Sequence, residues 1–189
     1  MNDVNETTAI LMGLEYQKNA FTADEIASIQ HDVEENGIRF EARETNRIIM
    51  AASIDEMFAA LTIFLSSGGL HEIVQAVSQS AIYDALKASV KRIWMMVKAK
   101  DFAKITASSI EKTEPQVHLY VDGHTLVFPK NLDSEVANHF IDKAFEYIEK
   151  IECPQQVYVF YNKKKDRLEQ FTEQELLQQA IRKHAKKSQ

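Results

Sequence analysis

The fold is decided by residues 117–128, which read Val-His-Leu-Tyr-Val-Asp-Gly-His-Thr-Leu-Val-Phe. Asp122-Gly123 is a dipeptide that favours a two-residue type I′ turn, and short apolar runs flank it on both sides. Pairing outward from the turn brings together Val121 with His124, Leu119 with Leu126 and Val117 with Phe128. The other face then carries His118, Tyr120, Thr125 and Val127. The segment is therefore predicted to be a β-hairpin.

A β-α-β unit is predicted on the N-terminal side of this hairpin. Residues 9–16 form a short apolar run, and residues 38–43 alternate apolar and charged, so both are expected to be strands. The helix between them starts at the capping box Thr22–Glu25 and ends at Asn36-Gly37. Such a unit most often closes a parallel pair of strands.

The middle of the chain is predicted to be helical. A capping box at Ser53–Glu56 opens a helix whose apolar face is Ile54, Met57, Phe58, Leu61, Phe64 and Leu65. After the turn at Ser66–Gly69, a second helix runs from Leu70 to about Lys100, with a break near Ser78–Ser80 as an alternative. A short strand at Arg47–Ala52 is a further expectation.

The C-terminal part is predicted to add a helix over 134–151, a strand over 157–161 and a terminal helix. The terminal helix starts at the capping box Thr172–Glu175 and is expected to turn its apolar residues inward: Leu176, Leu177, Ala180, Ile181 and His184. The fold class is therefore α+β or α/β, with a single mixed sheet of about five strands and helices on one or both faces. We expect one domain over residues 1–161, followed by a basic C-terminal helix over 162–189.

Composition excludes several classes of protein. The 189 residues include only 5 Gly, 3 Pro and 1 Cys, which rules out collagen-like chains and disulfide frameworks, and 45% hydrophobic content rules out global disorder. Cys153 is interpreted as a structural thiol. The first eight residues are polar and acidic, and the longest apolar stretch has nine residues, so we expect a cytoplasmic location and no membrane span.

Charge is distributed unevenly along the chain. Residues 162–189 carry eight Lys or Arg and four Asp or Glu, a charge of +4, which leaves −10 on residues 1–161. An acidic body repels phosphate backbones and disfavours nucleic acid as its partner. The basic tail is either a solvated helix end or a weak contact for an acidic partner or nucleic acid.

Three groups of residues are candidate binding sites. His118, Tyr120 and Thr125 form one predicted face of the hairpin, which we interpret as a contact patch. Arg39 and Arg43 share one strand face and could bind phosphate, although neighbouring glutamates favour a solvated ion-pair face instead. Ser67, Gly68 and Gly69 precede a helix and could bind an anion with free backbone N–H groups, or could simply separate two helices.

No nucleotide-binding, zinc-protease, serine-hydrolase or Cys-pair motif occurs in the sequence, and no cofactor, metal site or catalytic residue is predicted. A diffuse metal-dependent or hydrolase-like site remains an alternative. Its candidate residues are His118, Asp122 and His124, although the predicted register turns the two histidines to opposite faces.

The order of elements, with the strings Leu65-Ser-Ser-Gly-Gly69 and Val117-His-Leu-Tyr-Val-Asp-Gly123, resembles the bacterial effector-associated constant component modules over residues 8–151. That resemblance implies a small non-catalytic α/β module of a bacterial conflict system and assigns no functional residue. The chain departs from that layout by an added strand and a basic terminal helix.

The leading hypothesis is therefore a non-catalytic bacterial interaction or regulatory module that binds a protein partner. An enzyme with a diffuse motif is one alternative, and an acidic immunity-type protein that binds a basic toxin is another. Homo-oligomerisation is a further hypothesis, through the long helix or through an exposed edge of the hairpin.

Overall fold

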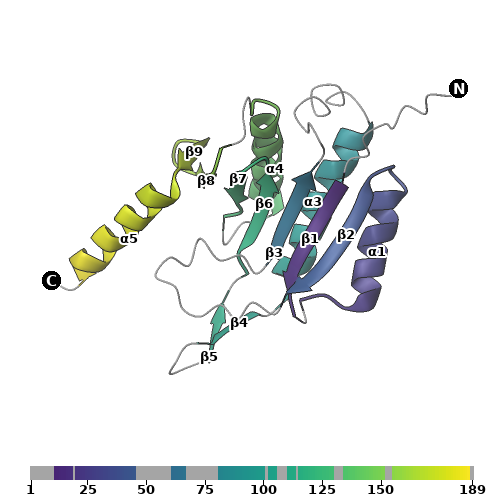
Figure 1. Cartoon of the computed structure of the whole chain (residues 1–189), viewed down its shortest axis with the longest axis horizontal. Helices are drawn as coiled ribbons and strands as arrows, with labels where there is room; N and C mark the ends of the chain where they lie inside the picture. The colour runs from purple at the N-terminus through teal and green to yellow at the C-terminus, as the bar shows by residue number, and fades with distance from the viewer. Residues whose placement is uncertain are drawn as a thin grey trace, which may run out of the picture.

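A computed structural model describes residues 11–18, 20–45, 61–66, 81–100, 102–105, 110–113, 115–129, 134–151 and 155–187. The elements run in this order: β1 (Leu11–Gln17), α1 (Ala23–Glu34), β2 (Arg39–Thr45), β3 (Leu61–Ser66), α3 (Ala81–Lys98), β4 (Phe102–Ile105), β5 (Ile110–Thr113), β6 (Val117–Val121), β7 (His124–Val127), α4 (Ser134–Ile148), β8 (Val157–Asn162), β9 (Arg167–Phe171) and α5 (Glu173–Lys187). Figure 1 shows their arrangement.

The fold is α+β and is built on one mixed sheet, as predicted. Its strand order is β2-β1-β3-β6-β7-β8-β9, which is seven strands rather than about five, and β4 and β5 pair separately. Three neighbouring pairs are parallel and three are antiparallel. The sequence-based count was too low because it missed β9 and assigned β3 to a helix.

The predicted hairpin is confirmed in detail. Val121 pairs with His124 and Leu119 with Leu126, and the Phe128 N–H donates to the Val117 carbonyl at 2.9 Å. Asp122 and Gly123 have φ values of 47° and 86°, as a type I′ turn requires. The hairpin lies between β3 and β8 in the middle of the sheet. It therefore presents no exposed edge for self-association, contrary to that expectation.

The N-terminal β-α-β unit is also confirmed, with β1 and β2 parallel. The capping box at the start of α1 is complete, because the Thr22 N–H donates to Glu25 Oε2 at 2.8 Å and the Glu25 N–H donates to Thr22 Oγ1 at 3.2 Å. Gly37 follows the helix with a φ of 76°, which ends it as the sequence predicted.

Helices α1, α3 and α4 pack against the same face of the sheet, which we call the covered face. Its central residues form a cross-strand row that is at most 1% exposed, the covered row: Leu14, Ile63, Leu119, Leu126 and Val159. The opposite face carries none of these three helices and is called the open face. In Figure 1 it faces the viewer, with α3 behind the strands.

The predicted helix over residues 54–65 is wrong at its C-terminal end, which is strand β3. Leu61, Ile63 and Leu65 are buried on the covered face, whereas Thr62 and Phe64 between them are half-buried. The apolar run Met57–Leu65 fits the residue spacing of a helix as well as that of a strand. Pairing with β1 and β6 selects the strand. The other predicted part of this helix lies outside the described residues.

The C-terminal segment differs most from its prediction. The expected boundary at residue 161 falls within β8, and residues 167–171 form the edge strand β9. Helix α5 starts at the predicted capping box, but only its first turns lie near the sheet, and its far end projects away from it (Figure 1). Leu176 is buried, whereas Leu177 and Ile181 are 42% and 67% exposed, so the expected inward face is wrong for these two residues.

Several predicted features lie outside the described residues: the strand at Arg47–Ala52, the capping box at Ser53–Glu56, the break near Ser78–Ser80, and Cys153. The predicted long helix is seen as α3 over its second half. None of the helices in the described part of the chain is sufficiently long and apolar to cross a membrane.

Candidate functional site

One row of side chains crosses the open face from strand to strand. Phe64 of β3 pairs with Tyr120 of β6, Tyr120 with Thr125 of β7, Thr125 with Tyr158 of β8, and Tyr158 with Phe171 of β9. All five residues, which we call the aromatic row, are half-buried. Four of the five are aromatic, so this row differs from the aliphatic covered row, which lies one residue away on β3, β6, β7 and β8.

A glycine makes room at one end of the aromatic row. Gly13 of β1 pairs with Phe64, and a Cβ at residue 13 would lie 3.3 Å from the Phe64 Cβ, which is tighter than ordinary packing. Without that Cβ, the Phe64 ring lies 5.4 Å from the Tyr120 ring. The glycine therefore helps to seat the first aromatic pair of the row.

The middle of the aromatic row borders an open groove of about 520 Å³. Its floor contains Tyr120, Thr125 and Tyr158, and its wall is the first turn of α5 with Glu173, Gln174 and Leu177. The groove is thus lined by two aromatic rings, several uncharged polar groups and one carboxylate. Such a mixture suits a ligand with both apolar and hydrogen-bonding groups.

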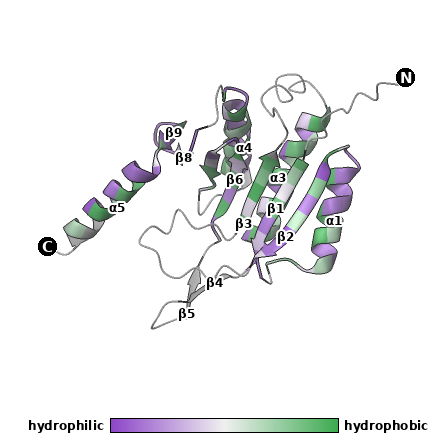
Figure 2. Ribbon diagram, viewed as in Figure 1, coloured by the Kyte–Doolittle hydropathy of each residue, from purple (hydrophilic) through white to green (hydrophobic). Residues whose placement is uncertain are grey.

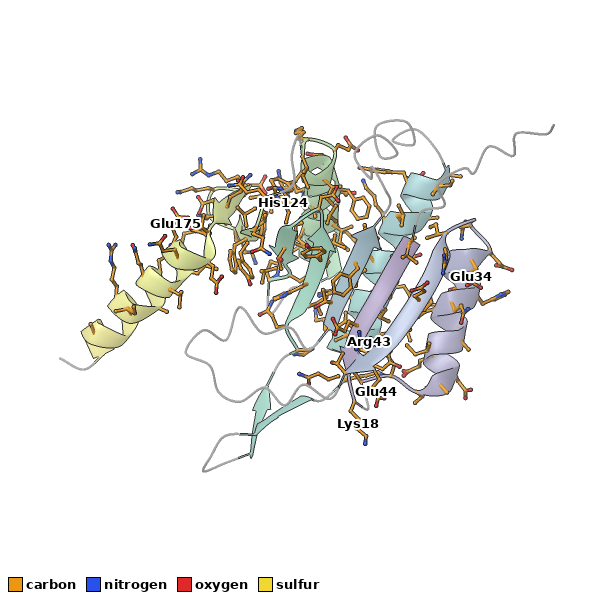
Figure 3. All side chains as sticks on the ribbon, viewed as in Figure 1. Lys18, Glu34, Arg43, Glu44, His124 and Glu175 are labelled. Atoms are coloured by element: carbon orange, nitrogen blue, oxygen red, sulfur yellow. The ribbon has the colours of Figure 1, made fainter. Side chains whose placement is uncertain are left out.

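The groove wall is held by the capping box of α5. The Thr172 N–H donates to Glu175 Oε2 at 2.8 Å, and the Glu175 N–H donates to Thr172 Oγ1 at 3.3 Å. Figure 3 shows Glu175 at the start of this helix. Partial burial, with the charge of Glu173 as a smaller cause, raises the pKa of Tyr158. Tyr158 therefore stays a neutral hydroxyl at physiological pH and can donate a hydrogen bond in the groove.

Two of the three residues of the predicted contact patch lie as their register predicted. Tyr120 and Thr125 are cross-strand neighbours on one face, as expected, and both line the groove. His118 shares that face but is only 4% exposed, so its prediction as a surface residue is wrong. It lies in the sheet interior, paired with Thr62 of β3 and Val127 of β7.

His124 lies on the covered face, and it is buried as well. Its Nδ1 is 2.7 Å from the Tyr147 hydroxyl of α4, and burial raises the pKa of Tyr147 to about 12. His118 and His124 therefore point to opposite faces, as their register predicted, and do not converge with Asp122. Among the described residues, no group of three or more His, Cys, Asp or Glu side chains could hold a metal ion.

Arg39 and Arg43 lie on β2, at the far edge of the sheet from the groove. β1 and β3 separate them from the hairpin, and Figure 3 shows Arg43 well away from His124. Arg39 donates to Glu41 at 2.6 Å, which fits the ion-pair alternative for this strand face. The other predicted anion site, Ser67, Gly68 and Gly69, lies outside the described residues.

A cluster that the sequence analysis missed ties the β8–β9 turn to α4. Asp166, whose φ is 49°, accepts a hydrogen bond from the Tyr161 hydroxyl at 2.6 Å and lies 2.8 Å from His139 Nε2 and 3.3 Å from Lys143 Nζ. The Tyr161 bond, then His139, lowers the pKa of Asp166 to about 2, and the same bond raises the pKa of Tyr161 to about 12. This cluster ties the turn of the edge hairpin β8–β9 to α4. The i, i+4 spacing of His139 and Lys143 was its one visible signal.

A second hollow of about 510 Å³ lies between α1 and α3. Of its three acidic residues, Asp32 pairs with Arg92, and the hollow contains no aromatic side chain. The aromatic row and its groove are therefore the stronger candidate site.

Comparison with known proteins adds no relative. No protein-family model, no curated protein and no solved structure matches this chain. The molecule is thus defined by its own fold and surface: an α+β protein with one covered and one open sheet face, and a groove where the open face meets α5.

Proposed function

We propose that this chain is a non-catalytic interaction module that binds a segment of a partner protein along the aromatic row and its groove. The observation that carries this proposal is the register that brings Tyr120, Thr125 and Tyr158, from three strands, into one groove. Tyrosine supplies large contact area and a hydroxyl at a small entropic cost, and it is enriched at protein interfaces.

The expected partner segment combines basic and apolar residues. Glu173 is the charged residue that lines the groove, and the whole chain has a net charge of −6. A Lys or Arg of the partner would meet Glu173, while an apolar side chain would pack against the tyrosine rings. The acidic surface would also speed the approach of such a partner. The resemblance to the non-catalytic constant component modules agrees with this role.

A random peptide library displayed on phage, selected against the full chain, tests the proposal directly. We expect enriched peptides to contain Lys or Arg near an aromatic or aliphatic residue. Binding of a selected peptide should weaken by about 10-fold or more in Tyr158→Ala, because a central aromatic anchor is lost. Isothermal titration calorimetry measures this change.

Tyr16→Ala is the matched control, since Tyr16 is also a half-buried tyrosine on a strand but lies on the covered face beside Phe21. It should leave peptide affinity unchanged while lowering stability. Peptides that bind equally well to Tyr158→Ala, or a preference for single-stranded oligonucleotides over every peptide, would contradict the proposal. Binding that requires a divalent ion would favour the enzyme alternative instead.

A further inference from the structure

Helix α5 exposes an apolar stripe that begins at the groove wall and continues on the part that extends beyond the sheet. Leu177, Ile181 and Ala185 are spaced four residues apart, so they lie along one side of the helix, and all three are exposed. Ile181 is 67% exposed, the highest exposure of any large apolar residue in the described part of the chain. Figure 2 shows hydrophobic segments along α5 where it stands clear of the other elements.

The charges of α5 are separated into two blocks. Glu173 and Glu175 lie in its first turn, residues 176–181 carry no charge, and Arg182 begins a basic block that continues with three lysines to residue 187. The apolar stripe starts in the uncharged block and continues into the basic one. Part of this separation suits the helix dipole, which favours acidic residues at the N-terminus and basic residues at the C-terminus.

The same separation makes the helix complementary to an antiparallel copy of itself. If the uncharged block of one copy is laid against that of another, Glu175 comes level with Arg182 of the second copy, and Leu177 comes close to Ile181 of the second copy. A two-fold axis repeats both contacts, and the acidic end of each helix then meets the basic end of the other. A parallel pair would instead place like charges side by side.

We infer that α5 is a self-association surface and that its occupant is α5 of a second copy of this chain, in an antiparallel two-fold pair. The pairing covers Leu177 and Ile181 and matches opposite charges at both ends. It leaves α1, α3 and α4 on the sheet unchanged. Ile181 and Arg182 lie outside the groove, whereas Leu177 also lines its wall, so the pairing borders the groove but needs no groove ligand.

Sedimentation equilibrium of the full chain, from about 1 to about 100 μM at low salt, tests the inference. We expect a concentration-dependent dimer. Ile181→Asp should weaken dimerisation at least about 100-fold, because both copies lose a buried side chain and gain like charges at the seam. Gln179→Asp is the matched control, since residue 179 is exposed on the opposite side of α5 and should leave the dimer intact.

The charge pairing has its own test. Arg182→Glu should weaken the dimer, and raising the salt from about 0.05 to about 0.5 M should weaken the wild type more than this variant. A wild-type chain that stays monomeric across the concentration range would overturn the inference. So would a dimer that Ile181→Asp and Gln179→Asp weaken equally, or a monomer that binds anionic lipid vesicles through Ile181. Tyr158→Ala should still dimerise, which separates this result from the groove.

Discussion

The two faces of the seven-stranded sheet carry different side chains in adjacent rows. On the covered face, Leu14, Ile63, Leu119, Leu126 and Val159 are almost completely buried beneath α1, α3 and α4. On β3, β6, β7 and β8 the adjacent residue belongs to the aromatic row, which ends at Phe171 of β9 and is only half-buried. Aliphatic side chains fill a close-packed interior, whereas tyrosines present both an apolar ring and a hydroxyl at a surface.

This difference separates the residues that hold the fold from those that are available to a partner. The same β-pairing registers create both rows, so any change that shifts a register disturbs stability and binding together. A substitution within a row should instead affect one property far more than the other. The following substitutions test that separation, starting with the largest expected effect.

Removing a side chain from the covered row should cost the most. Leu126→Ala should lower the free energy of unfolding by about 3 kcal/mol, because Leu126 is fully buried in the middle of the sheet and the shortened side chain leaves a cavity. Urea unfolding followed by circular dichroism measures this loss. A loss below about 1 kcal/mol would mean that the covered row does not carry the fold.

The turn that sets the hairpin register should be nearly as sensitive. Gly123 has a φ of 86°, and a Cβ there would lie 2.8 Å from the Gln155 carbonyl oxygen. Gly123→Ala should therefore lower the free energy of unfolding by about 2 kcal/mol or more and weaken peptide binding as well, because Tyr120 and Thr125 depend on this register. Gly37→Ala is the control: it shares a positive φ of 76° but meets nothing within 4 Å, so its loss should be smaller.

The Asp166 cluster should make stability depend on pH in two ranges. The pKa of Asp166 is lowered to about 2, so the stability it contributes is present above its ordinary pKa and is lost as the pH falls through about 2. The pKa of Tyr161 is raised to about 12, so its contribution is present below its ordinary pKa and is lost as the pH rises through about 12. Asp166→Asn should be less stable than the wild type at pH 7.

This deficit of Asp166→Asn should shrink as the pH falls from the ordinary range of aspartate toward about 2. Urea unfolding of both proteins at several pH values measures it. A deficit that stays constant over this range would show that the cluster does not stabilise the ionised Asp166.

The smallest effect is expected at the charged edge of the sheet. Arg39 is 67% exposed and pairs with an exposed Glu41, and exposed ion pairs contribute little. Arg39→Ala should change the free energy of unfolding by less than about 0.5 kcal/mol and leave peptide binding unchanged. Calorimetry with the selected peptide checks the binding, and a marked loss there would extend the binding surface across the whole open face.

The predictable parts of this molecule are local. The hairpin was found because the Asp122-Gly123 turn sets its own pairing, and α1 because a capping box and Asn36-Gly37 mark its ends. The strand β3 was mistaken for a helix, since the run from Met57 to Leu65 fits the residue spacing of both. Only pairing with its neighbours β1 and β6 decides between them.

The candidate site was less predictable because it is assembled from distant segments. Tyr120 and Thr125 were identified on their hairpin, but Phe64, Tyr158 and Phe171 join them only through strand pairings that no local pattern encodes. The same limit explains α5, whose amphipathic pattern indicates an apolar face without saying what covers it. His118 shows the reverse error, since its alternating position suggested a surface and the neighbouring strands bury it.

The most direct test of the account compares two neighbours on one strand. Leu119 belongs to the covered row and Tyr120 to the aromatic row, and urea titration of Leu119→Ala and Tyr120→Ala gives the loss in free energy of unfolding for each. We predict a loss of about 3 kcal/mol for Leu119→Ala and about 1 kcal/mol for Tyr120→Ala, with peptide binding lost only in the second. Equal losses, or a larger loss for Tyr120→Ala, would contradict the separation of the two faces.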